Sequence, residues 1–230
     1  MEMQKNIDRP EAVFFDLDGT LVMLGVNWEN LRGELHTLFI KYGIDMDFRP
    51  MLSKVEDALS IISTKFPEKE AKMAKEVAYG IIEAHEVRGA MNSKLIESAR
   101  DIIGFLKEKG CYIGIISRNS RRTIEVALEN HKISDIDIIV SREDTSLIKP
   151  HPDQIFAAFK RLEVKNPYGI MVGDHPFDIV SGKSAGIITV GVLTGVGTEK
   201  ELRDAGADYI FENLKEFKQF LGGVYENPHS

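Results

Sequence analysis

Asp16-Leu17-Asp18-Gly19-Thr20 follows directly on a short apolar run, Ala12-Val13-Phe14-Phe15. That run is too short and too rich in β-forming residues for a helix, so it predicts a buried strand that ends at the acids. Continued strand geometry places Asp16 and Asp18 on the same side, and Gly19 lets the backbone turn tightly after them. Two carboxylates at the carboxyl end of a strand indicate a reaction centre, although taken alone an acidic turn explains these five residues equally well.

The composition predicts an ordinary soluble globular protein. The 230 residues are 43% hydrophobic, which is enough for a sizeable core, and the formal net charge of −7 disfavours general binding to nucleic acid or to an anionic membrane. The first ten residues are too polar for a signal peptide, and no run of about eighteen apolar residues is present, so we expect a cytoplasmic protein without a membrane partner. The single cysteine, Cys111, excludes an internal disulfide, and its apolar neighbours predict a packing role.

A helical pattern runs from Trp28 to about Arg88. Apolar residues recur at helical spacing on at least two stripes, which is typical of amphipathic helices packed in a bundle. Asn27 is an expected N-cap and Gly43 an expected helix stop. Pro50 and Pro67 suit the first turns of a second and a third helix.

The period changes after this block, where short runs rich in Ile, Val and Tyr alternate with helical segments. The expected strands are 112–116, 136–140, 168–172 and 188–192, and the expected helices lie near 95–109, 120–131, 152–162 and 178–185. Continuous apolar strands separated by helices predict a parallel sheet covered on both faces. The expected fold is therefore an α/β core of residues 1–21 and 92–230, interrupted by a helical domain of residues 22–91. Residues 222–230 have weak periodicity, and we expect them to be loosely held.

Three further strand ends carry polar residues where ligands bind in open α/β sheets. Ser117-Arg118-Asn119-Ser120 offers a hydroxyl and backbone N–H groups to an anion, or simply caps the next helix. Lys149-Pro150-His151-Pro152-Asp153 has a stiff backbone that can aim an ammonium inward, with an exposed lysine beside a turn as the alternative. Gly173-Asp174-His175-Pro176-Phe177-Asp178 brings two more acids, and paired oxygen ligands of this kind suit magnesium.

Together with the first stretch, these segments resemble the four motifs of the haloacid dehalogenase superfamily, in the same order and over nearly the whole chain outside the helical block. The position and length of that block resemble the first cap class of the superfamily. The resemblance implies a Rossmann-like parallel sheet core with an inserted α-helical cap domain that closes over the site.

The resemblance also implies a role for each motif residue. Asp16 is the expected nucleophile, which forms an aspartyl-phosphate, and Asp18 is the expected acid and base. Magnesium is the expected cofactor, held by Asp16, Asp174 and the backbone carbonyl of Asp18, with Asp178 orienting the metal site. The expected phosphate-binding groups are Lys149, Ser117 and the backbone N–H groups near Asp18, Gly19 and Arg118, while Thr20 supports the turn. Asn119 follows Ser117 by two positions, where many relatives have asparagine directly after the serine, so its supporting place is open.

The implied activity is magnesium-dependent hydrolysis of a small phosphorylated metabolite, similar to that of a phosphoglycolate phosphatase. The acid at Asp18 argues against true dehalogenation. A hexose phosphomutase similar to β-phosphoglucomutase, and a phosphate-binding module without turnover, remain as alternatives. Met23 and Leu24 stand where phosphoglycolate phosphatases often have an acid and a serine, which weakens any naming of the substrate.

Substrate selection is expected in the helical block, in the loop from Gly43 to Pro50. Arg49 is the candidate contact to a second anionic group, because a guanidinium makes two parallel hydrogen bonds to a carboxylate. A solvated loop arginine is the alternative. His85 and Arg88 are weaker candidates, and His175 is expected at the surface. The sequence leaves the oligomeric state open between monomer and homodimer.

Overall fold

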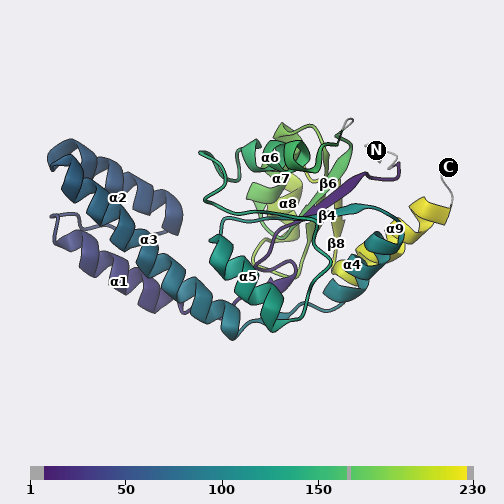
Figure 1. Cartoon of the computed structure of the whole chain (residues 1–230), viewed down its shortest axis with the longest axis horizontal. Coiled ribbons are helices and arrows are strands. Elements are labelled where there is room, and N and C mark those ends of the chain that lie inside the picture. Colours follow the sequence, from purple (N-terminus) through teal and green to yellow (C-terminus); the bar gives the residue numbers. More distant parts are fainter. Residues whose placement is uncertain (1–7, 165–166, 227–230) are drawn as a thin grey trace. The chain divides into compact units, whose positions relative to one another are not determined.

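The chain folds into two compact units in a computed structural model that describes residues 8–164 and 167–226. An α/β unit comprises Met1–Leu24 and Ser93–Ser230, and a helical unit comprises Gly25–Asn92. Figure 1 shows the run of elements along the chain. A short antiparallel pair, β2 (Val22–Met23) and β3 (Lys94–Leu95), stands in the α/β unit immediately before and after the helical insertion. Within the described ranges, every helix is too short or too polar to pass through a lipid bilayer.

A six-stranded sheet in which every neighbouring pair is parallel forms the centre of the α/β unit. Its strands are β1 (Ala12–Phe15), β4 (Tyr112–Ile116), β5 (Ile138–Val140), β6 (Gly169–Gly173), β7 (Ile188–Val192) and β8 (Tyr209–Phe211), in the order β5-β4-β1-β6-β7-β8. The predicted α/β sheet is confirmed, whereas β8 was not predicted. The central strand β1 is buried along its whole length, as expected for a strand covered on both faces.

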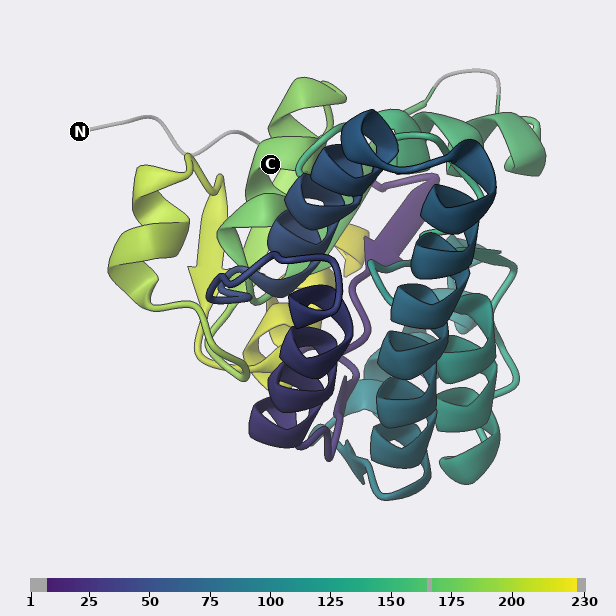
Figure 2. The ribbon, with the colours of Figure 1, turned by 90° about the vertical axis from the view of Figure 1, so that its left-hand side faces the viewer.

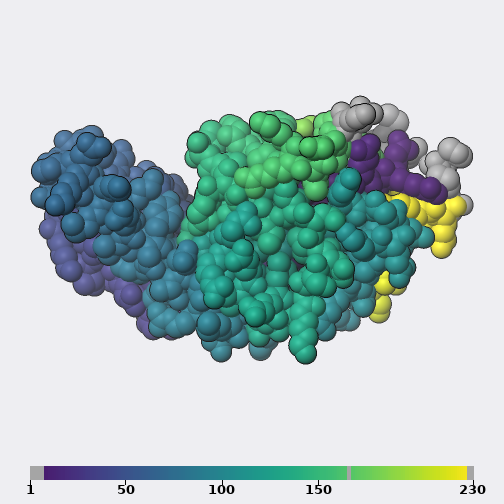
Figure 3. All heavy atoms as spheres, viewed as in Figure 1, coloured from purple at the N-terminus to yellow at the C-terminus, as the bar shows by residue number. Residues whose placement is uncertain are grey.

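In the described part of this unit, the helices around the sheet are α4 (Ala99–Glu108), α5 (Arg121–Asn130), α6 (Asp153–Leu162), α7 (Pro176–Ser184), α8 (Glu199–Asp204) and α9 (Leu214–Glu226). On one face Phe14 of β1 packs edge to face against Phe159 of α6, with ring centroids 4.9 Å apart. In Figure 3, teal and green atoms of α5, α6 and their loops close over one face of the unit. Cys111 is buried at 4% exposure, which confirms its packing role, and burial raises the pKa of its thiol to about 12.

The expectation of a loosely held end from residue 222 is wrong for the residues that the structure describes. Gly222 and Gly223 lie within α9, which continues to Glu226. The Tyr225 ring packs edge to face against Phe105 of α4 with centroids 5.7 Å apart, and the Arg9 guanidinium lies 5.6 Å from its centroid. Aromatic packing from a distant helix therefore overrides the weak local pattern. Residues 227–230 lie outside the described residues.

The helical unit contains α1 (Trp28–Ile40), α2 (Met51–Lys65) and α3 (Glu68–Met91), which Figure 2 shows packed lengthwise. Asn27 caps α1 as predicted, because its Oδ1 accepts the N–H of Asn30 at 3.0 Å, and Gly43 follows α1 at a φ of +71°. Pro50 and Pro67 stand directly before α2 and α3, one position earlier than the first turns in which they were expected. Phe39 stacks on Phe48 at 5.2 Å in the core of this unit.

Candidate active site

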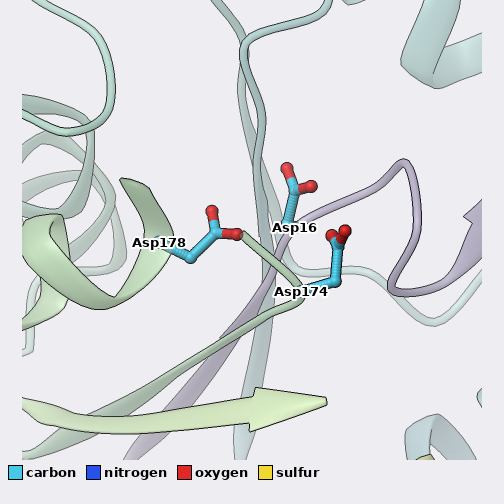
Figure 4. Close-up of side chains that lie close together, drawn as sticks. All are labelled: Asp16, Asp174 and Asp178. Atoms are coloured by element: carbon cyan, nitrogen blue, oxygen red, sulfur yellow. The ribbon is translucent and has the colours of Figure 1, made fainter. Parts of the chain in front are cut away.

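Three carboxylates converge at the carboxyl end of the central strands. Asp16 directly follows β1, Asp174 directly follows β6, and Asp178 lies in the first turn of α7. Figure 4 shows the three side chains, whose oxygen atoms include one from each residue within 4.8 Å of one another. Asp16 is 9% exposed, and the other two are almost fully buried. Adjacent parallel strands end at the same edge, and this is why residues distant in sequence meet here.

Lys149 places its ammonium between two of these carboxylates. Its Nζ lies 2.6 Å from Asp16 Oδ1 and 2.6 Å from Asp178 Oδ1, and its side chain is 2% exposed. Burial acts to lower the pKa of Lys149, but the two carboxylates outweigh burial and raise it above its ordinary value. Lys149 is therefore a fixed buried cation, and the alternative of an exposed turn lysine is wrong.

The two acids beyond β6 hold their protons more tightly than ordinary aspartates. Burial raises the pKa of Asp174 to about 7, with Asp16 and Asp178 adding to the shift, while the Val196 N–H opposes it. Burial also raises the pKa of Asp178 to about 6, although the positive charge of Lys149 acts to lower it. Close, desolvated carboxylates repel one another, and a bound cation relieves that repulsion. An all-oxygen donor set of this kind fits Mg²⁺.

The turn after β1 is built around Gly19, which has a φ of +85°. A Cβ on Gly19 would stand 2.6 Å from Asp174 Cγ, so only glycine allows this approach. Thr20 Oγ1 donates to Asp174 Oδ1 at 3.2 Å. Asp18 Oδ1 accepts the Leu24 N–H at 2.8 Å, and the Asp18 side chain is not part of the carboxylate trio. A metal contact from the Asp18 backbone carbonyl stays a prediction.

The loop after β4 places Asn119 against Ser117. Ser117 Oγ donates to Asn119 Oδ1 at 2.9 Å and accepts the Asn119 N–H at 3.2 Å, and both residues are buried. Asn119 thus touches the serine in spite of the intervening residue. Ser120 caps α5, because its Oγ accepts the N–H of Thr123 at 3.1 Å.

Gln154, which the sequence analysis missed, links two of the site loops. Its Nε2 donates to the Ser117 carbonyl at 2.8 Å, and its Oε1 accepts the Lys149 N–H at 3.0 Å. The side chain is fully buried. A polar residue on the stripe of α6 that carries Ile155 and Ala158 was the available signal, because a buried amide requires hydrogen-bond partners.

The loop after β7 was also missed, and it wraps around Asp174. Thr194 Oγ1 donates to the Gly19 carbonyl at 2.6 Å, and the Val196 N–H donates to Asp174 Oδ2 at 2.9 Å. A Cβ on Gly195 would stand 2.0 Å from Asp174 Oδ2. The Thr-Gly-Val-Gly stretch, which begins two positions after the end of the predicted strand 188–192, could have revealed this loop, because that strand ends at the same edge of the sheet.

Comparison with known proteins agrees with this arrangement. The family model of the haloacid dehalogenase-like hydrolases matches residues 13–192, which is most of the chain and includes the loops that follow β1, β4 and β6 and the loop that carries Lys149. The chain belongs to this family. As a haloacid dehalogenase-like hydrolase, the chain is an enzyme.

Individual relatives of this hydrolase align over nearly its full length. It is 28% identical to the pyrophosphatase PpaX of Bacillus cereus over 221 residues, which cover 94% of this chain and 98% of that protein. It has the fold of a phosphonoacetaldehyde hydrolase-like protein from Oleispira antarctica, with a TM-score of 0.69, 19% identity and coverage of 99% and 98%. A Haemophilus somnus protein described as a predicted phosphoglycolate phosphatase gives a TM-score of 0.65 at 18% identity, with coverage of 94% and 100%.

The remaining candidates of this hydrolase lie in the helical unit. The Arg49 side chain is 67% exposed, and its Nε lies 3.9 Å from Asp47 Oδ1. His85 is buried, with Nε2 at 2.9 Å from Glu34 Oε1. Arg88 Nε donates to the Ala84 carbonyl at 3.3 Å, within its own helix. His85 and Arg88 thus have partners within their own unit, and a substrate contact from Arg49 stays a prediction.

His175 is not the surface residue that the sequence predicted. It is half-buried and caps α7, because its ring Nδ1 accepts the Phe177 N–H at 3.1 Å. The backbone N–H of His175 donates to Asp178 Oδ2, also at 3.1 Å. Burial lowers the pKa of the His175 imidazole, and the nearby Arg118 charge lowers it further. The prediction failed because His175 forms a capping box with Asp178, and these hydrogen bonds hold it next to the carboxylates.

Proposed function

We propose that this hydrolase is a magnesium-dependent phosphatase, which cleaves a small phosphomonoester through a phosphorylated Asp16. The observation that carries the proposal is the Asp16 carboxylate itself, held by Lys149 at 2.6 Å and standing within 4.8 Å of Asp174 and Asp178 oxygens. The buried ammonium of Lys149 holds this carboxylate in place, so that it can act as a nucleophile toward a phosphoryl group.

Asp16, Asp174 and the Asp18 carbonyl would hold Mg²⁺, with Asp178 orienting the site. When bound, the ion supplies positive charge that offsets the repulsion between the carboxylate and an anionic substrate. Lys149 contributes a second positive charge to the same end. Its contact with one Asp16 oxygen leaves the other oxygen for attack at phosphorus.

The loops after β1 and β4 would supply groups for the oxygens of the transferred phosphoryl. These groups are the Ser117 hydroxyl and the backbone N–H groups near Asp18, Gly19 and Arg118. Ser117 donates its proton to Asn119 Oδ1 in the structure. Rotation of the Asn119 amide by half a turn presents Nδ2 to the serine oxygen, and the hydroxyl proton is then available to the phosphoryl group.

Asp18 would move the proton in both halves of the reaction. In the first half an Asp16 oxygen bonds to phosphorus, the bond to the leaving oxygen breaks, and that oxygen takes the Asp18 proton. In the second half Asp18 takes a proton from water, the water oxygen bonds to phosphorus, and the bond to Asp16 breaks with release of orthophosphate. The Leu24 N–H holds the Asp18 carboxylate at 2.8 Å and so fixes its orientation.

The names of the relatives suggest candidate substrates. The name of the aligned Bacillus cereus protein gives pyrophosphate as a first candidate, and the Haemophilus somnus neighbour gives phosphoglycolate. A hexose phosphomutase would use the same loops, and its product would be an isomer instead of free phosphate.

A screen of small phosphoesters, sugar phosphates, nucleotides and pyrophosphate with Mg²⁺ tests the proposal when orthophosphate and isomers are both measured. We expect stoichiometric orthophosphate, and Asp16→Asn lowers the rate by at least about 10⁴-fold with an unchanged circular dichroism spectrum, because an amide cannot attack phosphorus. Asp204→Asn, which removes an exposed acid of α8, is the matched control and keeps full activity. Isomer without orthophosphate would support the mutase, and no turnover by folded, magnesium-loaded protein would refute both.

A further inference from the structure

Arg118, Phe177 and His175 form a cluster that the proposed chemistry does not use through its side chains. The Arg118 guanidinium carbon lies 4.8 Å from the centroid of the Phe177 ring. The His175 ring packs against Phe177, with ring centroids 4.5 Å apart. All three side chains are partly exposed, so a ligand can reach them. The guanidinium is therefore held in place by an aromatic face, a contact that is strengthened when the cation is desolvated.

This cluster lies beside the nucleophile. Arg118 comes from the loop after β4 and Phe177 from the start of α7, which follows β6, and these two strands flank β1 on either side. Their contact therefore bridges the strand end from which Asp16 projects.

The proposed mechanism does not need the Arg118 guanidinium to bind the transferred phosphoryl group. Lys149, the Ser117 hydroxyl, the backbone N–H groups and Mg²⁺ already account for the charge and oxygens of that group in the proposed mechanism. A guanidinium offers two parallel N–H groups that match a carboxylate or a phosphate. Stacking on Phe177 orders the long side chain before binding, which lowers the entropic cost of recognition.

We propose that Arg118, held on Phe177, binds a second anionic group on the leaving side of the substrate, either a phosphate or a carboxylate. This subsite rests on the proposed phosphatase function and narrows its substrates to phosphoryl compounds whose leaving group is itself anionic. His175 completes the wall of the subsite and keeps Phe177 in position through the Phe177 N–H bond to its ring.

Kinetics on paired substrates test the subsite. Arg118→Met lowers kcat/KM about 100-fold for pyrophosphate and for phosphoglycolate, and less than about fivefold for ethyl phosphate, whose leaving group is neutral. Each substrate is compared between variant and parent, so differences in intrinsic reactivity cancel. Arg118→Lys keeps the charge without the planar fork and loses about tenfold on the anionic pair. Phe177→Leu removes only the aromatic face that holds Arg118. Its kcat/KM also falls more for the two anionic substrates than for ethyl phosphate, but by a smaller factor than in Arg118→Met. Arg122→Met, which removes an exposed charge of α5, is the matched control for long-range electrostatics.

Binding separates this proposal from the proposed turnover. Calorimetry with Mg²⁺ compares methylenediphosphonate and phosphonoacetate with methylphosphonate, which has no second anionic group. The parent protein binds the first two at least about 20-fold more tightly, and Arg118→Met removes that preference. Whichever doubly anionic ligand binds more tightly identifies phosphate or carboxylate as the group recognised.

Two results overturn the subsite: equal losses on anionic and neutral substrates, which would place Arg118 on the transferred phosphoryl group, or an unchanged preference for the doubly anionic ligands. If the parent protein shows the Arg118-dependent binding preference but releases no phosphate from any substrate, the subsite stands and the proposed phosphatase function falls.

Discussion

The loops of the α/β unit and the polar candidates of the helical unit differ in how their charges are held. In the α/β unit, Asp16, Lys149 and Asp178 are withdrawn from solvent and bonded to one another. In the helical unit, Arg49 is largely exposed, and the buried His85 pairs with a single exposed glutamate. Burying several charges is costly unless they compensate one another, so a closed network of this kind indicates a site. We therefore place the chemistry in the α/β unit, and the predictions test that contrast.

After the loss of the nucleophile itself, the largest effect is expected at Lys149, whose removal leaves two buried carboxylates without their cation. Lys149→Met lowers kcat about 10³-fold, because the charge acts directly on the nucleophile. It also lowers the free energy of unfolding by about 3–5 kcal/mol at pH 8 without metal. Rate assays and urea unfolding measure the two effects.

The helical unit provides the matched control for that variant. Lys54 of α2 is an exposed lysine whose Nζ lies 2.8 Å from Asp57 Oδ2. Lys54→Met changes the unfolding free energy by less than about 1 kcal/mol, as surface pairs do, and leaves kcat unchanged. Comparable losses in the two variants would contradict the contrast between the units.

The pH dependence of stability is the next largest effect. The pKa of Asp174 is raised from its ordinary value of 3.8 to about 7, and that of Asp178 to about 6. A raised carboxyl pKa stabilises the folded state at low pH, and this contribution is lost as pH rises through the folded value. Metal-free protein therefore loses stability between about pH 4 and pH 7 on account of these two groups.

Urea unfolding of the metal-free protein across this pH range checks the sign. Asp174→Asn removes one of the two titrations, so the stability of the parent relative to this variant falls as pH rises. Added Mg²⁺ restores the parent above pH 7, because the ion binds the ionised carboxylates. A parent that gains stability over the variant with rising pH would show that the sign is wrong.

A smaller effect is expected from the loop after β7. Gly195→Ala forces a methyl group to within 2.0 Å of Asp174 Oδ2 and displaces either the loop or the carboxylate. We expect the Mg²⁺ concentration for half-maximal activity to rise about 10–100-fold, which is the usual effect of disturbing the groups that orient a metal ligand. If the Mg²⁺ concentration for half-maximal activity is unchanged, this loop has no role in positioning Asp174 for the metal.

The smallest effect is a gain in the helical unit. Gly80 is an exposed glycine within α3, and a Cβ on it meets no heavy atom within 4 Å. Gly80→Ala raises the unfolding free energy by about 0.5–1 kcal/mol, because alanine loses less conformational freedom in a helix. Thermal unfolding measures the gain, and a loss of stability instead would reveal packing against Gly80 that the structure lacks.

The sequence predicted the parts of the site that strand topology determines. Asp16, Ser117 and Asp174 each stand directly after an apolar run, and parallel strands necessarily bring such ends together. The sequence could not predict contacts that depend on how loops approach one another. Gln154 looks like an ordinary helical residue in the sequence, and its role depends on the Ser117 and Lys149 backbones that contact it in the fold. The packing of Tyr225 likewise depends on α4 lying beside α9. The assigned chemical roles of the motif residues stay predictions.

The most direct test of the account is to trap the phosphorylated enzyme. The protein is mixed with pyrophosphate or phosphoglycolate and Mg²⁺, quenched in acid after milliseconds, and its peptides are analysed by mass spectrometry. The account predicts one phosphoryl group on the peptide that contains Asp16, absent from Asp16→Asn and longer-lived in Asp18→Asn, which cannot activate the hydrolytic water. Orthophosphate release by the parent protein with no phosphoryl group on Asp16 at any quench time, together with turnover by Asp16→Asn, would contradict it.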